Sequence, residues 1–234
     1  MTVEELLGQM IQADFEAVTN LEHRTSPEEA VTFKLGSLLV SGSAAPTAEG
    51  NIAKMPPVLE FEKQMDTLRA GTAANWNKLT SRFSKLGIPV TTKDGHKYKI
   101  GFLLGTDAVH GDQHTVGSVL FPHNIGMSCS HNPTNFYNSG KWTKEALKKS
   151  GFNYAFAPTV AVSHNPQWGR YYETMGQEDE WVTQYGEAYV AGLQDVSQET
   201  KKIRGVLASA KHFLADGATT YGCNMGNSNV YNFK

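Results

Sequence analysis

The chain has 234 residues, of which 40% are hydrophobic and 19% are charged, and its formal net charge is −2. This length is enough to bury a substantial core. Both signs of charge are spread along the chain, with no basic block that would indicate a nucleic-acid partner and no acidic tail. Because no apolar run approaches the roughly 20 residues that cross a bilayer, we also expect no membrane span.

The cysteine content and the first residues bear on the cellular compartment. Two cysteines, Cys129 and Cys223, are too few for a disulfide framework, so we expect ordinary small side chains. The charged, amphipathic start MTVEELLGQM is unlike a signal peptide. These features favour a cytoplasmic location, although the sequence leaves the compartment unknown.

The first predicted element is a helix at the N-terminus. Thr2 and Glu5 form a capping-box pattern, and apolar residues follow at helical spacing. The apolar run 35–42, closed by Gly and Ser, predicts a short buried strand. The small, polar and Pro-rich stretch 43–57 is typical of a loop.

The strongest helical pattern covers residues 65–86, where apolar and aromatic side chains recur every three or four residues. Gly87 and Pro89 are expected to end this helix. It contains Met65 and Trp76, and we interpret it as a core or interface helix. The next run, 97–105, predicts a strand closed by a glycine.

Helices and strands alternate along the rest of the chain. We predict helices over 141–151 and 178–193, a strand or strand pair over 152–162, and a strand over 205–210. Such alternation with apolar strands indicates a parallel sheet in an α/β fold. No repeat or linker divides the chain, so we predict a single domain over residues 1–234.

Polar residues that follow the carboxyl ends of strands carry function in folds of this kind. Four polar clusters follow apolar runs here, at residues 106–111, 122–124, 163–173 and 211–216. Their recurrence is more informative than any one of them, and it predicts a site at one edge of the sheet.

These clusters resemble motifs of the N-terminal barrel domain of glycoside hydrolase family 3, the β-glucosidase and exo-β-glucanase type. The segments that carry the resemblance are LLGTDAVHG, LFPHNIGM, FAPTVAVSHNPQWGRYYETMGQE and SAKHFLADGATTYG. They follow the family's order from about residue 2 to about residue 228. The resemblance implies a (β/α)8 TIM-type barrel and hydrolysis of O-glycosyl bonds in carbohydrate metabolism. We expect no cofactor and no metal.

The resemblance also implies roles for four residues. Asp107 matches the carboxylate that grips hydroxyls of a terminal β-glucosyl unit, and charged acceptors make strong hydrogen bonds. Arg170, Lys211 and His212 match donors around the same sugar ring, and their charge would help to keep neighbouring carboxylates ionised. The loop 164–167 departs from the family, because His, Asn and Gln replace two Arg and an Asp of the family motif.

The predicted site lacks a catalytic pair. A retaining glycosidase needs two carboxylates about 5–5.5 Å apart. The family's nucleophile, an Asp in a Ser-Asp-Trp-like motif, has no counterpart in this sequence, so we assign no catalytic residue and leave open whether the chain is an enzyme. About five or six of the barrel's eight βα units are expected here.

An incomplete barrel would expose sheet edges and core, so we expect another chain or a second copy to cover it. The alternative hypothesis is a catalytically inactive, truncated relative that serves as a structural or assembly subunit. A third possibility is that the sequence is a fragment of a longer product.

Several candidate residues also have other interpretations. His110 and His114 have the spacing of a zinc-binding helix, but the glycine between them sits in a turn and the motif's Glu is missing, so we favour a turn. Asp107 could cap a helix instead of binding sugar. Lys211 and His212 could instead be salt-bridged residues under a barrel rim.

Three further residues are expected to be structural. Trp168 is expected in the core rather than as a sugar platform. His123 and Asn124 are expected to hold loops by hydrogen bonds. The Gly-rich stretch 217–228 lacks the spacing of a phosphate-binding loop.

Overall fold

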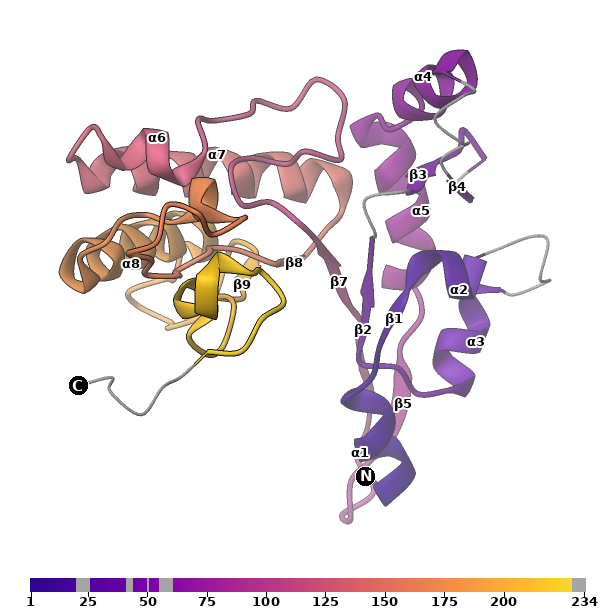
Figure 1. Cartoon of the computed structure of the whole chain (residues 1–234). Helices are drawn as coiled ribbons and strands as arrows, with labels where there is room; N and C mark the ends of the chain where they lie inside the picture. The colour runs from indigo at the N-terminus through magenta and orange to yellow at the C-terminus, as the bar shows by residue number, and fades with distance from the viewer. Residues whose placement is uncertain (20–25, 41–43, 50, 55–60, 229–234) are drawn as a thin grey trace. The chain divides into compact units, whose positions relative to one another are not determined.

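A computed structural model describes residues 1–19, 26–40, 44–49, 51–54 and 61–228. The chain forms two compact units. The first unit contains residues 1–106, 114–117 and 147–154, and the second contains residues 107–113, 118–146 and 155–234. In Figure 1 the elements of the first unit begin in indigo, and the second unit ends in yellow.

A parallel sheet forms the centre of the first unit. Its strands β1 (Gln12–Asp14), β2 (Ser37–Leu39) and β7 (Leu103–Thr106) lie in the order β1-β2-β7. Leu38 of β2 stands opposite Leu104 of β7, and both side chains are buried. The sheet confirms the predicted α/β class with parallel strands, and β2 lies within the run predicted as a strand over 35–42.

Asn153 joins the next strand, β8 (Tyr154–Ala155), to this sheet. Its side-chain oxygen accepts from the backbone N–H of Leu104 at 2.7 Å, and its amide nitrogen donates to the carbonyl of Phe102 at 3.0 Å. One asparagine side chain thus makes two hydrogen bonds to the backbone at the start of β7. The strand predicted over 152–162 is therefore too long, because only two of its residues are strand.

The first unit also contains helices, which Figure 1 labels. They are α1 (Val3–Gln9), α2 (Phe15–Thr19), α3 (Pro27–Thr32), α4 (Phe61–Arg69) and α5 (Ala73–Ser84). The predicted capping box of α1 is confirmed, because the Glu5 N–H donates to Thr2 Oγ1 and the Thr2 N–H donates to the Glu5 carboxylate. In the core, Phe83 of α5 makes edge-on ring contacts with Phe15 and Phe102.

The single helix predicted over 65–86 is wrong in its continuity. The helix is interrupted between α4 and α5. There Thr72 is the N-cap of α5, and its side-chain oxygen accepts a hydrogen bond from the Asn75 N–H at 3.3 Å. The Asn75 amide also donates to the Ala70 carbonyl. The spacing of apolar residues continues across this break, which is why periodicity alone did not reveal it.

Two predicted stretches take part in antiparallel strand pairs. The predicted loop 43–57 is wrong, because β3 (Ala44–Pro46) pairs antiparallel with β4 (Ile52–Lys54). Positions 43, 50 and 55–57 of that stretch lie outside the described residues. The strand predicted over 97–105 is divided: β6 (Lys97–Ile100) pairs with β5 (Ile88–Thr91), and the separate strand β7 joins the parallel sheet.

The second unit contains long helices and short strands. Its regular elements are α6 (Asn124–Ser128), most of α7 (Pro133–Ser150), α8 (Asp179–Gln194), β9 (Leu207–Ala208) and short 3-10 helices at Tyr171–Glu173, Asp216–Ala218 and Thr220–Gly222. Next to Ala155 of β8, the Ser209 N–H beside β9 donates to the Ala155 carbonyl. The structure shows no strand at the apolar runs 118–121 and 160–162, and two residues separate β9 from the cluster 211–216. Three of the four clusters therefore do not directly follow a strand.

Helix α8 agrees with the prediction within a residue at each end, whereas α7 begins earlier than predicted. Asn132 and Pro133 start α7, since the Thr134 N–H donates to Asn132 Oδ1 at 3.0 Å and proline suits the first helical position. Gly151, with φ of 81°, ends the helix as predicted.

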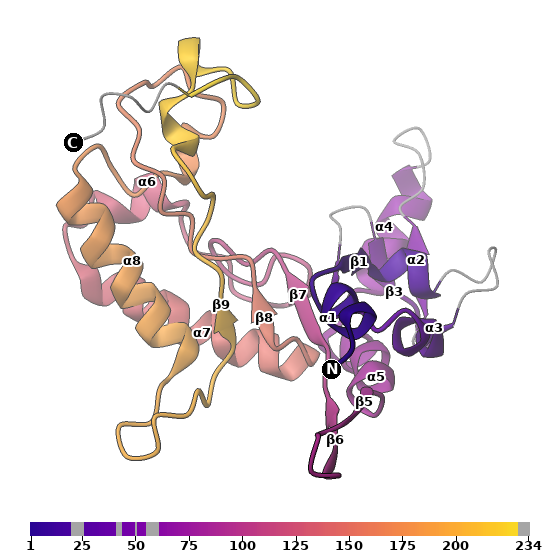
Figure 2. The same ribbon diagram turned by 90° about the horizontal axis from the view of Figure 1, so that it is seen from below.

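Helices α7 and α8 lie side by side in Figure 2. Gly140 of α7 and Gly192 of α8 allow this close approach, because a Cβ at Gly140 would overlap the Tyr189 carbonyl and one at Gly192 would overlap the Tyr137 carbonyl. From α8 the buried Tyr189 hydroxyl donates to the Ala108 carbonyl at 2.6 Å. The helix pair thereby fixes the backbone next to Asp107.

The parallel strands described here are fewer than the eight of a closed barrel, and the single-domain assignment to residues 1–234 stays a prediction. Among the described residues, no helix has both the length and the apolar character needed to cross a bilayer.

We expect Gly140→Ala to destabilise the protein by about 2 kcal/mol in urea unfolding. Overpacking against the Tyr189 carbonyl outweighs the better helix propensity of alanine, which is worth about 1 kcal/mol. Gly126→Ala in α6 is the matched control, because a Cβ there meets only Pro122 at an ordinary 3.6 Å. Equal unfolding midpoints for the two variants would contradict the close-packing interpretation.

Candidate functional site

Asp107 and Lys211 form an ion pair in the candidate site. Asp107 directly follows β7, and Lys211 lies beyond β9 in a parallel bridge with Thr159. The Lys211 ammonium donates to Asp107 Oδ1 at 2.6 Å. Asp107 precedes no helix, so its carboxylate binds a side chain rather than capping a helix.

Arg170 and Glu173 form a two-point ion pair. Arg170 Nε donates to Glu173 Oε1 at 2.9 Å, and Arg170 Nη2 donates to Oε2 at 2.7 Å. The Glu173 side chain is only 8% exposed. Thr159 Oγ1 donates to the same carboxylate, and the buried Asn124 amide donates to the Glu173 carbonyl. Asn124 thus holds two segments together, as expected from the sequence.

The charge of this pair is fixed by its surroundings. Burial acts to raise the pKa of Glu173, but the hydrogen bonds and charge of Arg170 outweigh it, so the pKa lies below the usual value of a glutamate. Glu173 in turn raises the pKa of Arg170. Both groups therefore stay ionised at neutral pH.

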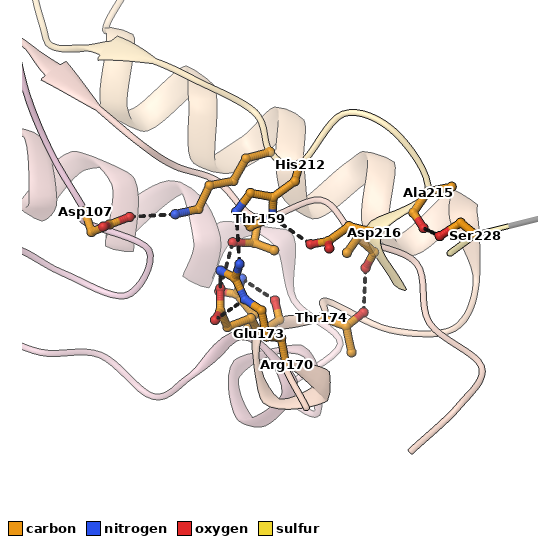
Figure 3. A network of polar contacts seen from close by, with 12 residues as sticks. Asp107, Thr159, Arg170, Glu173, Thr174, His212, Ala215, Asp216 and Ser228 are labelled. Carbon is orange, nitrogen blue, oxygen red and sulfur yellow. Dashed lines mark hydrogen bonds and ion pairs between the residues drawn. The ribbon is translucent and has the colours of Figure 1, made fainter. Parts of the chain in front are cut away.

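His212 links this pair to a further carboxylate, as Figure 3 shows. Its Nε2 lies 3.1 Å from Arg170 Nη1, and its Nδ1 lies 2.6 Å from Asp216 Oδ2. Glu173, Arg170, His212 and Asp216 thus form one continuous polar chain. The alternative of salt-bridged residues holds in part, because both Lys211 and His212 contact carboxylates.

A cavity of about 190 Å³ opens among these residues. It is lined by Asp107, Val109, His110, Gln113, His123, Arg170, Tyr172, Glu173 and Lys211. Three of the four predicted sugar-binding residues line it, whereas His212 contacts Arg170 and lines a separate cavity. Sequence reasoning assigned no role to Glu173 or Asp216, although the spacings Arg170-x-x-Glu173 and His212-x-x-x-Asp216 are the available signals.

Three rings form one wall of the cavity. The His110 and His123 rings lie 4.1 Å apart, and Tyr172 contacts His123 edge-on at 4.8 Å between centroids. Burial, together with the neighbouring His110, lowers the pKa of His123, so its neutral form is favoured. His110 Nδ1 lies 2.8 Å from the Phe121 carbonyl, and this hydrogen bond fixes the orientation of the His110 ring.

The zinc interpretation of His110 and His114 finds no support in these contacts. His110 bonds to a backbone carbonyl, and His114 Nδ1 lies 2.8 Å from Thr106 Oγ1. In the part of the chain that the structure describes, no group of three or more His, Cys, Asp or Glu side chains is arranged to hold a metal ion.

The divergent loop 164–167 forms a turn. Asn165 Oδ1 accepts from the Gln167 N–H at 3.0 Å, and the Asn165 carbonyl accepts from the Trp168 N–H. Because an amide oxygen serves this turn as well as a carboxylate oxygen, asparagine can replace aspartate here without loss of the turn. Trp168 is buried, which confirms its expected place in the core.

The model of the glycosyl hydrolase family 3 N-terminal domain matches residues 2–230. The chain belongs to glycosyl hydrolase family 3. A lysosomal β-glucosidase of Dictyostelium discoideum is 25% identical over 95% of this chain and 25% of its own length.

Solved structures of the family share the fold. A mutant form of the exo-1,3/1,4-β-glucanase ExoP from a Pseudoalteromonas species matches with a TM-score of 0.73 at 29% identity, over 97% of this chain and 32% of that chain. A β-glucosidase from Listeria innocua, in complex with isofagomine, matches with a TM-score of 0.63 at 21% identity, over 95% and 25%. The family 3 chain described here thus spans about a quarter to a third of the length of these relatives.

We expect Glu173→Gln to lower the free energy of unfolding by about 2–3 kcal/mol at pH 7, because it leaves Arg170 without its anionic partner in a mostly buried place. The folded-state pKa of Glu173 is depressed, so its stabilisation is present above the unfolded value of about 4.5 and is lost as the pH falls through the folded value. The difference between wild type and variant should therefore shrink below about pH 4.5.

Urea unfolding at a series of pH values measures both effects. Asp66→Asn is the control, because it removes the partner of an exposed Arg69 at the same i, i+3 spacing and should cost at most about 0.5 kcal/mol. A loss for Glu173→Gln that equals the control, or that does not change with pH, would overturn this account.

Proposed function

We propose that this chain binds a terminal glucosyl unit of a β-glucoside or glucan in the cavity lined by Asp107, Arg170 and Lys211. The observation that carries the proposal is a carboxylate placed beside two cations in one small cavity. Each sugar hydroxyl both donates and accepts, so it is matched by a carboxylate oxygen on one side and an N–H group on the other.

The hydrogen-bond capacity of these side chains supports a polyol ligand. Arg170 has five N–H groups, of which two are given to Glu173 and one to His212. One N–H on Nη1 and one on Nη2 are left for a ligand within the described structure. The Lys211 ammonium has three N–H groups, and one of them donates to Asp107 Oδ1. The other carboxylate oxygen of Asp107, Oδ2, can accept a hydrogen bond from a ligand.

The carboxylates that line the cavity are already bonded to protein groups, so hydrolysis would need a group from outside the described cavity. Of the two carboxylates that line it, Glu173 is occupied by Arg170 and Thr159, and Asp107 is paired with Lys211. A retaining mechanism requires a nucleophile and an acid/base about 5–5.5 Å apart. We propose that this chain supplies the sugar-binding half of such a site. The alternative is a catalytically inactive structural subunit, and it is favoured by the same pairing.

Titration calorimetry with glucose and with isofagomine tests the sugar site. We expect wild type to bind isofagomine, and Asp107→Ala to weaken binding at least tenfold, because a charged hydrogen bond is worth about 1.5–3 kcal/mol. Asp94→Ala removes a carboxylate from an exposed turn and should leave binding unchanged. No binding by wild type, or equal binding by Asp107→Ala, would refute the proposal.

A hydrolysis assay on the same preparation separates the two candidate functions. We expect the chain alone to release no nitrophenol from nitrophenyl β-glucoside. Release that is abolished by Asp107→Ala would show that the nucleophile lies within this chain, and it would exclude the inactive-subunit alternative.

The second unit has an exposed apolar surface, and this surface supports the hypothesis that another protein chain binds there. A cavity of about 540 Å³ lies among residues 160–162 and 210–218. Of its lining residues, Phe213 is 96% exposed and Leu214 is 68% exposed. Exposed apolar patches of this kind mark interaction sites. We propose that a second copy of this chain covers this surface when the chain is alone in solution.

Light scattering over a range of concentrations tests the covering partner. We expect wild type to form a dimer and Phe213→Ser to shift the equilibrium toward monomer by about tenfold, because burial of a phenylalanine is worth about 1.5–3 kcal/mol. Tyr98→Ser, which removes an exposed aromatic ring from β6, is the control. A wild type that stays monomeric at the highest concentrations would contradict the proposal.

A further inference from the structure

His212 contacts protein groups through both of its ring nitrogens. Nε2 faces the Arg170 guanidinium at 3.1 Å, and Nδ1 faces the Asp216 carboxylate at 2.6 Å. The side chain is 35% exposed and Asp216 is 16% exposed, so both lie partly out of water.

Only one protonation state of His212 satisfies both contacts. A guanidinium group has five N–H donors and no acceptor, so the Nε2 atom opposite Arg170 must offer a lone pair. The Nδ1 atom must then carry the proton, which it donates to Asp216. An imidazole with a proton on Nε2, or a doubly protonated ring, would set an N–H group against the N–H group of Arg170.

We propose that Asp216 is a positioning residue that acts through His212. By accepting the Nδ1 proton, it selects the tautomer whose Nε2 accepts from Arg170, and the guanidinium is thereby held at Nη1 by His212 and at Nε and Nη2 by Glu173. The consequence for sugar binding rests on the proposed function, because the two remaining N–H groups of Arg170 are then fixed in direction before a ligand arrives.

The segment around Asp216 is itself anchored. Ala215 adopts φ of 62°, and its carbonyl accepts from Ser228 Oγ at 2.9 Å. On the other side, Gly217 packs so closely against the Val162 carbonyl that a Cβ could not be placed there. These contacts hold the Asp216 carboxylate in position against the ring.

The tautomer can be read directly by NMR of the unliganded chain with ¹⁵N-labelled histidine, and His212→Gln assigns the signals. We expect His212 at pH 7 to show a protonated Nδ1 and an unprotonated Nε2. A protonated Nε2, alone or together with a protonated Nδ1, would overturn the proposal. This measurement needs no sugar, so a failure of the proposed function does not affect it.

Two variants test the positioning role. Asp216→Ala removes the acceptor of the Nδ1 proton, so it should raise the share of the tautomer with the proton on Nε2. That tautomer loses the bond from Arg170 Nη1, so isofagomine binding should weaken about tenfold. Asp216→Asn keeps an oxygen that accepts from Nδ1, so it should keep the tautomer and restore most of the affinity. Asp179→Ala, at the exposed start of α8, is the control. If the Asp216→Ala variant keeps the wild-type tautomer, Asp216 does not position His212.

Discussion

The buried carboxylate of Glu173 is the constraint on which the site depends. A carboxylate with so little exposure is costly to ionise unless a cation meets it with good geometry, and Arg170 does so at two points. The Glu173 carboxylate also accepts a hydrogen bond from the Thr159 hydroxyl, and the Glu173 backbone carbonyl accepts one from the Asn124 side chain. Three separate segments of the second unit thus meet at Glu173, and the two bonds that its carboxylate accepts set the direction of Arg170.

Sequence patterns located the longest helices because their local signals agree with their packing. Helix α8 has acids in its first turn and an apolar face, and the glycine that ends α7 has the positive φ that favours it. The sequence patterns indicate neither the break at Thr72 nor the pairing of Ala44–Pro46 with Ile52–Lys54. In the first, a side-chain cap interrupts an apolar period that continues, and in the second, strands of three residues are too short to show an alternation.

The candidate site was predicted through motifs rather than through geometry. Asp107, Arg170 and Lys211 line one cavity, although the sequence separates Asp107 from Lys211 by more than a hundred residues. The roles of Glu173 and Asp216 could not be derived in the same way, because a carboxylate a few residues from a cation is usually a surface pair of little consequence. Burial distinguishes Glu173 from such a pair, and burial is a property of the fold.

The pairing of charges in the cavity has a consequence for ligand choice. Among its described lining residues, the carboxylates of Asp107 and Glu173 balance the cations of Lys211 and Arg170, so their formal charges sum to zero. Such a cavity offers many hydrogen bonds but little long-range attraction to an ion. As the proposed sugar site, it would suit an uncharged glycoside better than a uronic acid or a sulfated glycan, and the affinity for such a ligand would respond only weakly to ionic strength.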